Sequence, residues 1–178
     1  KEGGTVNPMG LCSMSFPNES VEDVVEICRR RGVTAVEWSG RDYHLPPGTP
    51  EGRLREVARM CAGEGIDLPS YGSYHGVFND DPDNFNAQLD VAEALGCDTV
   101  RVWSGHWGDP GEMHEMTGEQ KVLLVERTRR VAEMGAERGL RVAFEYHTHT
   151  PTCGSEEVMG LIARAEHDNI YTYFQMIE

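Results

Sequence analysis

The sequence predicts an α/β fold of the (β/α)₈ barrel type, in which parallel strands alternate with helices around a closed sheet. Two observations predict it. Short apolar runs of strand length alternate with amphipathic helical patterns along the 178 residues. Polar side chains, histidines above all, follow several of these runs, and this is where the strands of a barrel reach the face that carries an active site.

Six strands are expected, and turn residues bound each of them. They begin near Met9, Val33, Ile66, Thr99, Arg141 and Ile170. Because helical patterns separate them, the sheet is expected to be parallel with right-handed crossovers. A doubly wound sheet is the alternative, but CSMSFPNES after the first strand lacks the glycine-rich turn typical of that fold.

Five helices are expected between the strands, each with a capping residue at its start. These residues are Ser20, Thr49, Asp81, Thr117 and Ser155. Ser20 and Thr117 have Asp23 and Gln120 three residues on, which is the capping-box pattern. Four helices end at a glycine placed before the next strand: Gly32, Gly65, Gly96 and Gly139.

The length of the chain falls short of a complete barrel. A (β/α)₈ barrel takes eight units and about 250 residues, whereas this chain shows six strands and ends on QMIE directly after the sixth. We interpret residues 1–178 as a single domain, an apparently truncated barrel of about six βα units. The open edges of such a sheet favour association with a second copy, so a homo-oligomer is expected.

Composition narrows the function classes. The chain is 39% hydrophobic and 26% charged, has no membrane-spanning run, and its first residues lack the apolar stretch typical of a signal peptide. Its five scattered cysteines include no C-x-x-C pair, which indicates reduced thiols in a cytoplasmic protein. The net charge of −14 repels phosphate backbones, so nucleic acid is not expected as a partner. A membrane is not expected either, because no apolar run is long enough to span one.

Histidines at strand ends are the clearest functional signal. Five of the seven follow a predicted strand: His44, His75, His106, His147 and His149. A single histidine there is typical of a polar loop, but the set indicates a site at the carboxyl ends of the strands. His114 and His167 are expected to be surface residues.

Glu145 and His147 are the strongest catalytic candidates. Side chains alternate along VAFEYH, so these two share one face of the strand. A carboxylate and an imidazole one pleat apart suit a divalent metal or a proton transfer. Glu37 occupies a similar position on the second strand. The alternative for both glutamates is a structural ion pair, for which Arg101 is the obvious partner.

Aromatic side chains cluster at or just after the strand ends. They are Phe16, Trp38, Tyr71, Tyr74, Trp103 and Trp107. Aromatic rings suit the apolar face of a sugar, although any one of them can instead pack beneath a loop.

These segments together resemble the xylose isomerase-like TIM barrel superfamily, the sugar phosphate isomerase/epimerase group. The matching segments, in chain order, are GVTAVEW, GRDYHLP, YGSYHGVF, ALGCDTVRVWSG, GLRVAFEYHTHT and NIYTYFQ. The resemblance implies an enzyme of carbohydrate metabolism that moves a proton next to a carbonyl of a sugar through an enediolate. It also implies a divalent metal ion (Mn, Mg, Co or Zn), with Glu145 as ligand and acid or base.

The resemblance further assigns His75 and His106 to the substrate or metal pocket, and we add His44 and Trp103 as substrate-binding candidates. One position departs from the family pattern, because Gln175 replaces the aspartate ligand usual after the sixth strand. Glutamine is a poor metal ligand, but its amide can bind a substrate hydroxyl. We expect His75, His106, Glu145, His147 and Gln175 to converge in one cavity, with Trp103 and Tyr74 on its walls.

Three alternatives remain open. The barrel can bind a sugar or a partner without a metal and without turnover, a reading that Gln175 favours. It can be a dehydratase of cyclic polyols. It can also be a metal nuclease resembling endonuclease IV, which the net charge of −14 disfavours.

Overall fold

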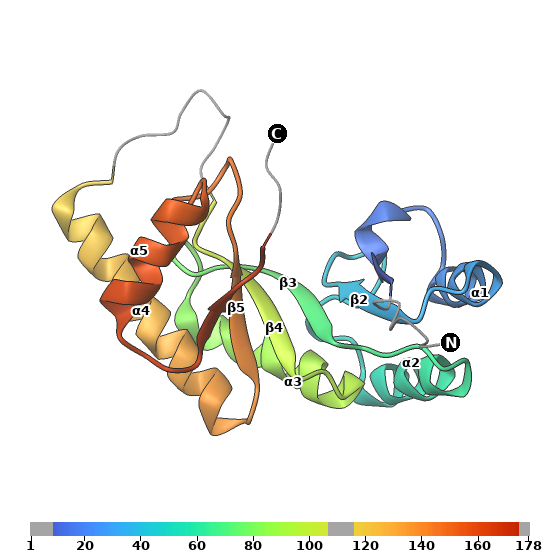
Figure 1. Cartoon of the computed structure of the whole chain (residues 1–178). Coiled ribbons are helices and arrows are strands. Elements are labelled where there is room, and N and C mark those ends of the chain that lie inside the picture. The colour runs from blue at the N-terminus through green and yellow to red at the C-terminus, as the bar shows by residue number, and fades with distance from the viewer. Residues whose placement is uncertain (1–8, 107–115, 175–178) are drawn as a thin grey trace, which may run out of the picture.

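The computed structural model describes residues 9–106 and 116–174 (Figure 1). Its strands form one six-stranded sheet in the order β1-β2-β3-β4-β5-β6. Each neighbouring pair is parallel. The parallel α/β prediction is therefore confirmed, and the sequential strand order is that of a barrel rather than a doubly wound sheet.

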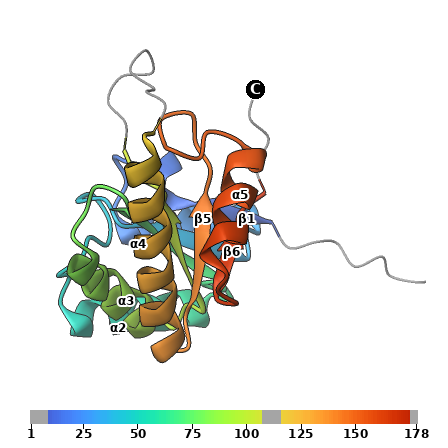
Figure 2. The ribbon, with the colours of Figure 1, turned by 90° about the vertical axis from the view of Figure 1, so that its left-hand side faces the viewer.

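The strands are β1 (Gly10–Cys12), β2 (Ala35–Ser39), β3 (Ser70–Gly76), β4 (Thr99–Trp103), β5 (Arg141–Glu145) and β6 (Ile170–Thr172). The α-helices are α1 (Val21–Arg31), α2 (Glu51–Gly63), α3 (Phe85–Leu95), α4 (Gly118–Glu137) and α5 (Ser155–Ala165). Two short 3₁₀ helices, η1 (Ser13–Ser15) and η2 (Pro82–Asn84), complete the described part. Figure 2, turned by 90° from Figure 1, shows the helices α3 and α4 packed along one face of the sheet.

Helix ends follow the capping chemistry that the sequence predicts, with local differences. Complete capping boxes stand at the starts of α1 and α4. The glycines after α1 to α4 all have positive φ, between 68° and 77°. Asp81, however, caps η2 instead of α3, and Ser155 is the first residue of α5 with no side-chain cap before it. The Thr49 hydroxyl donates to the Pro46 carbonyl at 2.6 Å and so closes a turn rather than capping α2.

Strict alternation along the strands divides the sheet into two chemically different faces. Val100 and Val102 of β4 and Phe144 of β5 are fully buried in the core between the sheet and the helices. Arg101, between the two valines, and Glu145, which follows Phe144, point to the opposite face, the inner face of the barrel, and form an ion pair there. The apolar core therefore fixes the register that directs the charged side chains inward.

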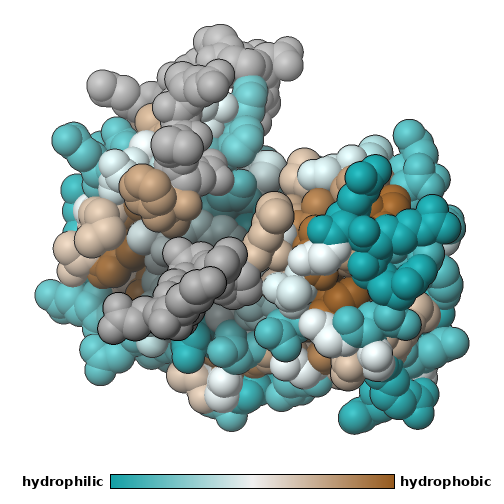
Figure 3. Space-filling view, turned by 45° about the vertical axis from the view of Figure 1, so that its right-hand side comes forward, coloured by the Kyte–Doolittle hydropathy of each residue, from teal (hydrophilic) through white to brown (hydrophobic). Residues whose placement is uncertain are grey.

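The face of the molecule in Figure 3 is largely hydrophilic. Figure 3 shows teal side chains over most of the visible face and brown, apolar patches beside a notch in the surface. In the part of the chain that the structure describes, no helix is long and apolar enough to cross a membrane.

Candidate functional site

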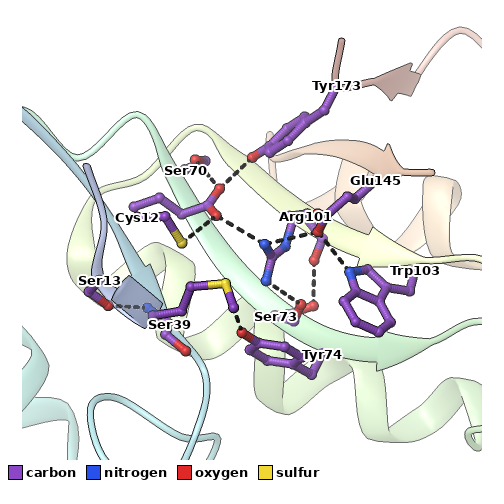
Figure 4. A network of polar contacts seen from close by, with 12 residues as sticks. Cys12, Ser13, Ser39, Ser70, Ser73, Tyr74, Arg101, Trp103, Glu145 and Tyr173 are labelled. Atoms are coloured by element: carbon purple, nitrogen blue, oxygen red, sulfur yellow. Dashed lines mark hydrogen bonds and ion pairs between the residues drawn. The ribbon is translucent and has the colours of Figure 1, made fainter. Parts of the chain in front are cut away.

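Arg101 stands at the centre of a polar network on the inner face of the sheet (Figure 4). Its side chain is buried, and its Nη1 lies 2.9 Å from Glu145 Oε2 and 3.3 Å from Glu37 Oε1. Burial by itself would lower the pKa of Arg101, but attraction to Glu37 and Glu145 outweighs it and raises that pKa above its usual value. Arg101 is therefore a fixed internal cation that joins β2, β4 and β5.

Glu37 is surrounded by hydrogen-bond donors. Its Oε2 accepts the hydroxyls of Ser70 and Tyr173, both at 2.7 Å, and its Oε1 accepts the Cys12 thiol at 3.5 Å. Burial and the nearby Glu37 charge raise the pKa of Cys12 to about 11, and the same two causes raise the pKa of Tyr173. Both groups therefore stay protonated at neutral pH and donate, so the geometry favours the structural interpretation of Glu37.

Glu145 differs from Glu37 in having one oxygen outside these contacts. Its Oε2 accepts the Trp103 indole N–H at 2.8 Å as well as the Arg101 guanidinium. The residue lines a cavity of about 360 Å³ together with Arg101, Tyr173 and Cys12. Glu145 is thus the structural partner of Arg101 and also a carboxylate that faces the barrel interior.

Rings gather around Trp103 at the carboxyl end of β4. The His147 ring stacks on Trp103 at 5.0 Å between centroids and 13° between planes, and His149 stacks on His147 at 5.3 Å. His106 and Tyr74 contact Trp103 at 5.2 Å and 5.6 Å. Trp103, His147, His149, His106 and Tyr74 are here called the aromatic wall. The wall lies beside Glu145, because Trp103 belongs to it and also donates to the Glu145 carboxylate.

The convergence expected from the sequence is only partly found. Among the described residues, the cavity lining includes Glu145 but not the other expected members, which are His75, His106, His147, Trp103 and Tyr74. His75 does not join the aromatic wall either. Its ring lies 5.0 Å from Phe85 of α3, and its Nδ1 lies 3.6 Å from Asp80. Neighbouring residues of a strand point to opposite faces, so Tyr74 on the inner face requires His75 to face the helices. Burial lowers the pKa of His75 below its usual value, an effect that Asp80 opposes.

His44 also lies apart from the aromatic wall. Its Nδ1 lies 3.0 Å from the Ser13 hydroxyl, and its ring packs edge-on against Trp38 and Tyr43. Ser13 Oγ also accepts the Ser39 N–H at 2.8 Å, and the tautomer of the His44 ring decides whether Ser13 donates to Nδ1 or accepts from it. Burial lowers the pKa of His44. Gln175, Trp107 and His114 lie outside the described residues.

The donors that could hold a metal are few. Within residues 9–106 and 116–174, no group of three or more histidine, cysteine, aspartate or glutamate side chains is arranged to hold a metal ion. Glu145 Oε1 is the carboxylate oxygen of the network that the described contacts leave available. The described residues alone therefore do not complete a metal centre, although Glu145 can contribute one ligand to it.

Arg41 is a residue that the sequence reasoning did not single out. It follows β2 by two residues, and its guanidinium carbon lies 3.8 Å from the centroid of the Tyr74 ring. The sequence signal was its position in SGRDYHLP, just past the carboxyl end of a predicted strand. Tyr173 was likewise missed, although its bond to Glu37 connects the last strand to the second.

Comparison with known proteins identifies the fold family. The family model described as xylose isomerase-like TIM barrel matches residues 25–175. No curated protein matches the chain in sequence.

Solved structures match nearly the whole chain at low sequence identity. A D-psicose 3-epimerase solved in the presence of D-fructose matches with a TM-score of 0.77 and 12% identity, over 93% of this chain and 62% of its own. The probable 3-DHS dehydratase AsbF of Bacillus anthracis matches with a TM-score of 0.76 and 19% identity, over the same shares. A xylose isomerase-like barrel from Mycobacterium smegmatis in complex with magnesium matches with a TM-score of 0.67 and 15% identity, over 93% and 63%.

Proposed function

This chain belongs to the xylose isomerase-like TIM barrel family, and we propose that it is a sugar or sugar-phosphate isomerase or epimerase. The observation that carries the proposal is the position of Glu145, which lines the interior cavity while its Oε2 is held by Arg101 and by Trp103 of the aromatic wall. The chain spans 62% of the epimerase that it matches, so the proposal concerns the whole protein to which these strands contribute.

The proposed chemistry begins with proton removal by Glu145. Its Oε1 takes the proton from the carbon next to the carbonyl of an open-chain sugar, and the electron pair moves toward the carbonyl oxygen to give an enediolate. Return of the proton to the former carbonyl carbon, while the neighbouring hydroxyl passes its proton to the former carbonyl oxygen, gives an isomer. An epimer requires protonation of the original carbon on its opposite face by a second acid on that side of the sugar. Arg101 and Trp103 hold the other oxygen, so Oε1 keeps one direction during both transfers.

The aromatic wall is proposed to bind the sugar. Trp103 and His106 offer ring faces for its apolar C–H groups, and the His147 imidazole can donate to or accept from a hydroxyl. Gln175 is proposed to bind a further hydroxyl. His44 and His75 are left out of the proposed site because they pack on other surfaces.

A divalent metal ion (Mn, Mg, Co or Zn) is part of the proposal, with the Glu145 carboxylate as one ligand. When bound, such an ion would stabilise the negative charge that develops on the sugar oxygen. Because the described residues form no group of three histidine, cysteine, aspartate or glutamate ligands, such an ion would need further ligands besides Glu145. No step of the proposed proton transfer is assigned to the ion.

Deuterium exchange tests the proposal. Ketoses and aldoses are incubated with the protein and Mn²⁺ in D₂O, and NMR follows deuterium entering the carbon next to the carbonyl. We expect exchange with wild type and a loss of at least about 100-fold with Glu145→Gln, which keeps the shape but removes the base. Exchange that survives in Glu145→Gln would assign the residue to structure alone and would require another catalytic carboxylate.

A second candidate function is sugar binding without turnover. The ion pair between Arg101 and Glu145 favours this function, because the guanidinium already occupies one of the two Glu145 oxygens that proton transfer or metal binding would use. Elemental analysis of the purified protein and calorimetry with sugars separate the two functions. Sugar binding with neither bound metal nor deuterium exchange would support the second candidate.

Self-association is also proposed. In the described sheet, β1 and β6 each pair with one strand, and the exposed side chains of Met9 and Phe174 lie next to these strands. Unpaired strand edges beside apolar side chains favour association. Light scattering of the 178-residue chain should give a mass above that of one copy, and a stable monomer would exclude this association.

A further inference from the structure

Arg41 is held at the carboxyl end of β2 by contacts that fix both its backbone and its guanidinium. The Gly40 N–H donates to the Gly72 carbonyl at 2.9 Å, and the Arg41 N–H donates to Ser39 Oγ at 3.3 Å. The guanidinium carbon lies 3.8 Å above the centroid of Tyr74, a cation–π distance. Tyr74 in turn contacts Trp103 at 5.6 Å, so Arg41 adjoins the aromatic wall.

This cation has no carboxylate partner among the residues that the structure describes. The ion pairs of residues 9–106 and 116–174 include Arg101 but not Arg41. Arg101 is buried and shared by Glu37 and Glu145, so its charge is already balanced. Arg41 is exposed, and stacking on Tyr74 leaves the N–H groups at its edge available to an acceptor.

The charge of the chain makes such a cation significant. With a net charge of −14, the protein repels anionic ligands at long range. A stacked arginine at the edge of the aromatic wall provides a local exception, because its planar guanidinium matches the geometry of phosphate and carboxylate oxygens.

We infer that Arg41 binds an oxyanion group of the ligand, so that the site takes an anionic sugar, either a phosphate monoester or a sugar acid, in preference to a neutral one. The inference rests on the proposed sugar site but not on turnover. The aromatic wall would hold the sugar ring or chain, and Arg41 would hold its charged end.

Calorimetry on the full chain at low ionic strength tests the inference with four probes: D-glucose, D-glucose 6-phosphate, D-glucuronate and inorganic phosphate. At least one charged sugar should bind about tenfold or more tightly than D-glucose, as a charge-assisted hydrogen bond provides. A preference for the phosphate or for the carboxylate identifies the source of the anion. Arg41→Met keeps the apolar stem on Tyr74 and should abolish the preference, while Arg41→Lys should retain part of it.

Arg59→Met is the matched control, because it removes one exposed arginine of α2 and changes the net charge by the same amount. It should leave all four affinities unchanged. The inference is wrong if charged and neutral sugars bind equally, if Arg41→Met keeps the preference, or if neither a charged sugar nor inorganic phosphate binds in an Arg41-dependent way. Glu145→Gln should keep the preference for a charged sugar, because the preference does not depend on turnover. If the wild-type protein shows Arg41-dependent binding but no deuterium exchange, the proposed enzyme activity is wrong and the anion site is still supported.

Discussion

The Tyr173 hydroxyl donates a 2.7 Å hydrogen bond to Glu37 Oε2 although 136 residues separate the two in sequence. Tyr173 follows β6, whereas Glu37 belongs to β2, so the bond crosses the interior between strands that are not neighbours in the sheet. Together with the two ion pairs of Arg101, it links β2, β4, β5 and the end of β6 through side chains (Figure 4).

Replacement of Glu37 should therefore destabilise the fold. Glu37→Gln leaves Arg101 with one carboxylate and places an amide N–H₂ among donors, so we expect the free energy of unfolding to fall by about 2–3 kcal/mol. Urea denaturation measures this loss. The control is Glu51→Gln, which breaks an exposed i,i+4 pair with Arg55 and should change stability by less than about 0.5 kcal/mol. Equal effects of the two substitutions would show that the network adds little stability.

Gly135 of α4 should not tolerate a side chain. A Cβ added there would lie 2.7 Å from Val142 Cγ2 and 2.8 Å from the Leu140 carbonyl oxygen, so α4 would have to move away from β5. We expect Gly135→Ala to lower the free energy of unfolding by about 1–3 kcal/mol, despite the higher helix propensity of alanine. Gly160→Ala in α5, where a Cβ meets nothing within 4 Å, should instead raise it by about 0.5–1 kcal/mol. Thermal melts of both variants test the pair, and a stabilised Gly135→Ala would contradict the close packing of α4.

Local sequence chemistry accounts for most of the fold. The capping boxes of Ser20 and Thr117 and the left-handed glycines mark where helices start and end, because they satisfy backbone groups within a few residues. Alternation along β5 likewise placed Phe144 in the core and Glu145 in the interior. These features depend on neighbours in the chain, and a sequence displays such neighbours directly.

The side-chain contacts inside the barrel were harder to predict from the sequence. The meeting of Arg101 with both Glu37 and Glu145 depends on how strongly the sheet curves, which no local pattern encodes. The outward direction of His75 could have been predicted, since the same alternation that places Tyr74 in the interior excludes its neighbour. Arg41 carried no pattern beyond its place after a strand, and its role depends on the distant Tyr74 ring.

Trp103→Phe should separate positioning of the base from binding of the sugar. Phenylalanine keeps a ring next to His147 but removes the N–H that holds Glu145 Oε2. We expect deuterium exchange to slow by about tenfold, because a misdirected carboxylate loses its productive geometry, while sugar affinity changes by less than about threefold. Tyr74→Phe, which loses a hydroxyl that contacts Met14 Sδ, is the control and should leave both unchanged. An unchanged exchange rate in Trp103→Phe would remove Trp103 from the positioning of Glu145.

Stability should fall as the pH is lowered from about 6.5 to 5, and His44 and His75 should cause the fall. Burial lowers the pKa of both imidazoles below the ordinary value of 6.5, so they stay neutral in the fold while the unfolded chain protonates them. Below pH 6.5 the unfolded state then binds more protons, and the free energy of unfolding decreases until the pH passes the folded pKa values. Hydrogen bonds from Arg29 and Arg30 lower the pKa of Glu26 to about 2. Protonation of Glu26 therefore affects stability only below about pH 4.5.

Urea denaturation at pH 7.5 and 5.5 should therefore show a smaller pH dependence in His44→Asn and in His75→Asn, and the smallest in the double variant. His167→Asn, at a partly exposed position, should keep the wild-type dependence, and an undiminished dependence in the double variant would assign the effect to other groups.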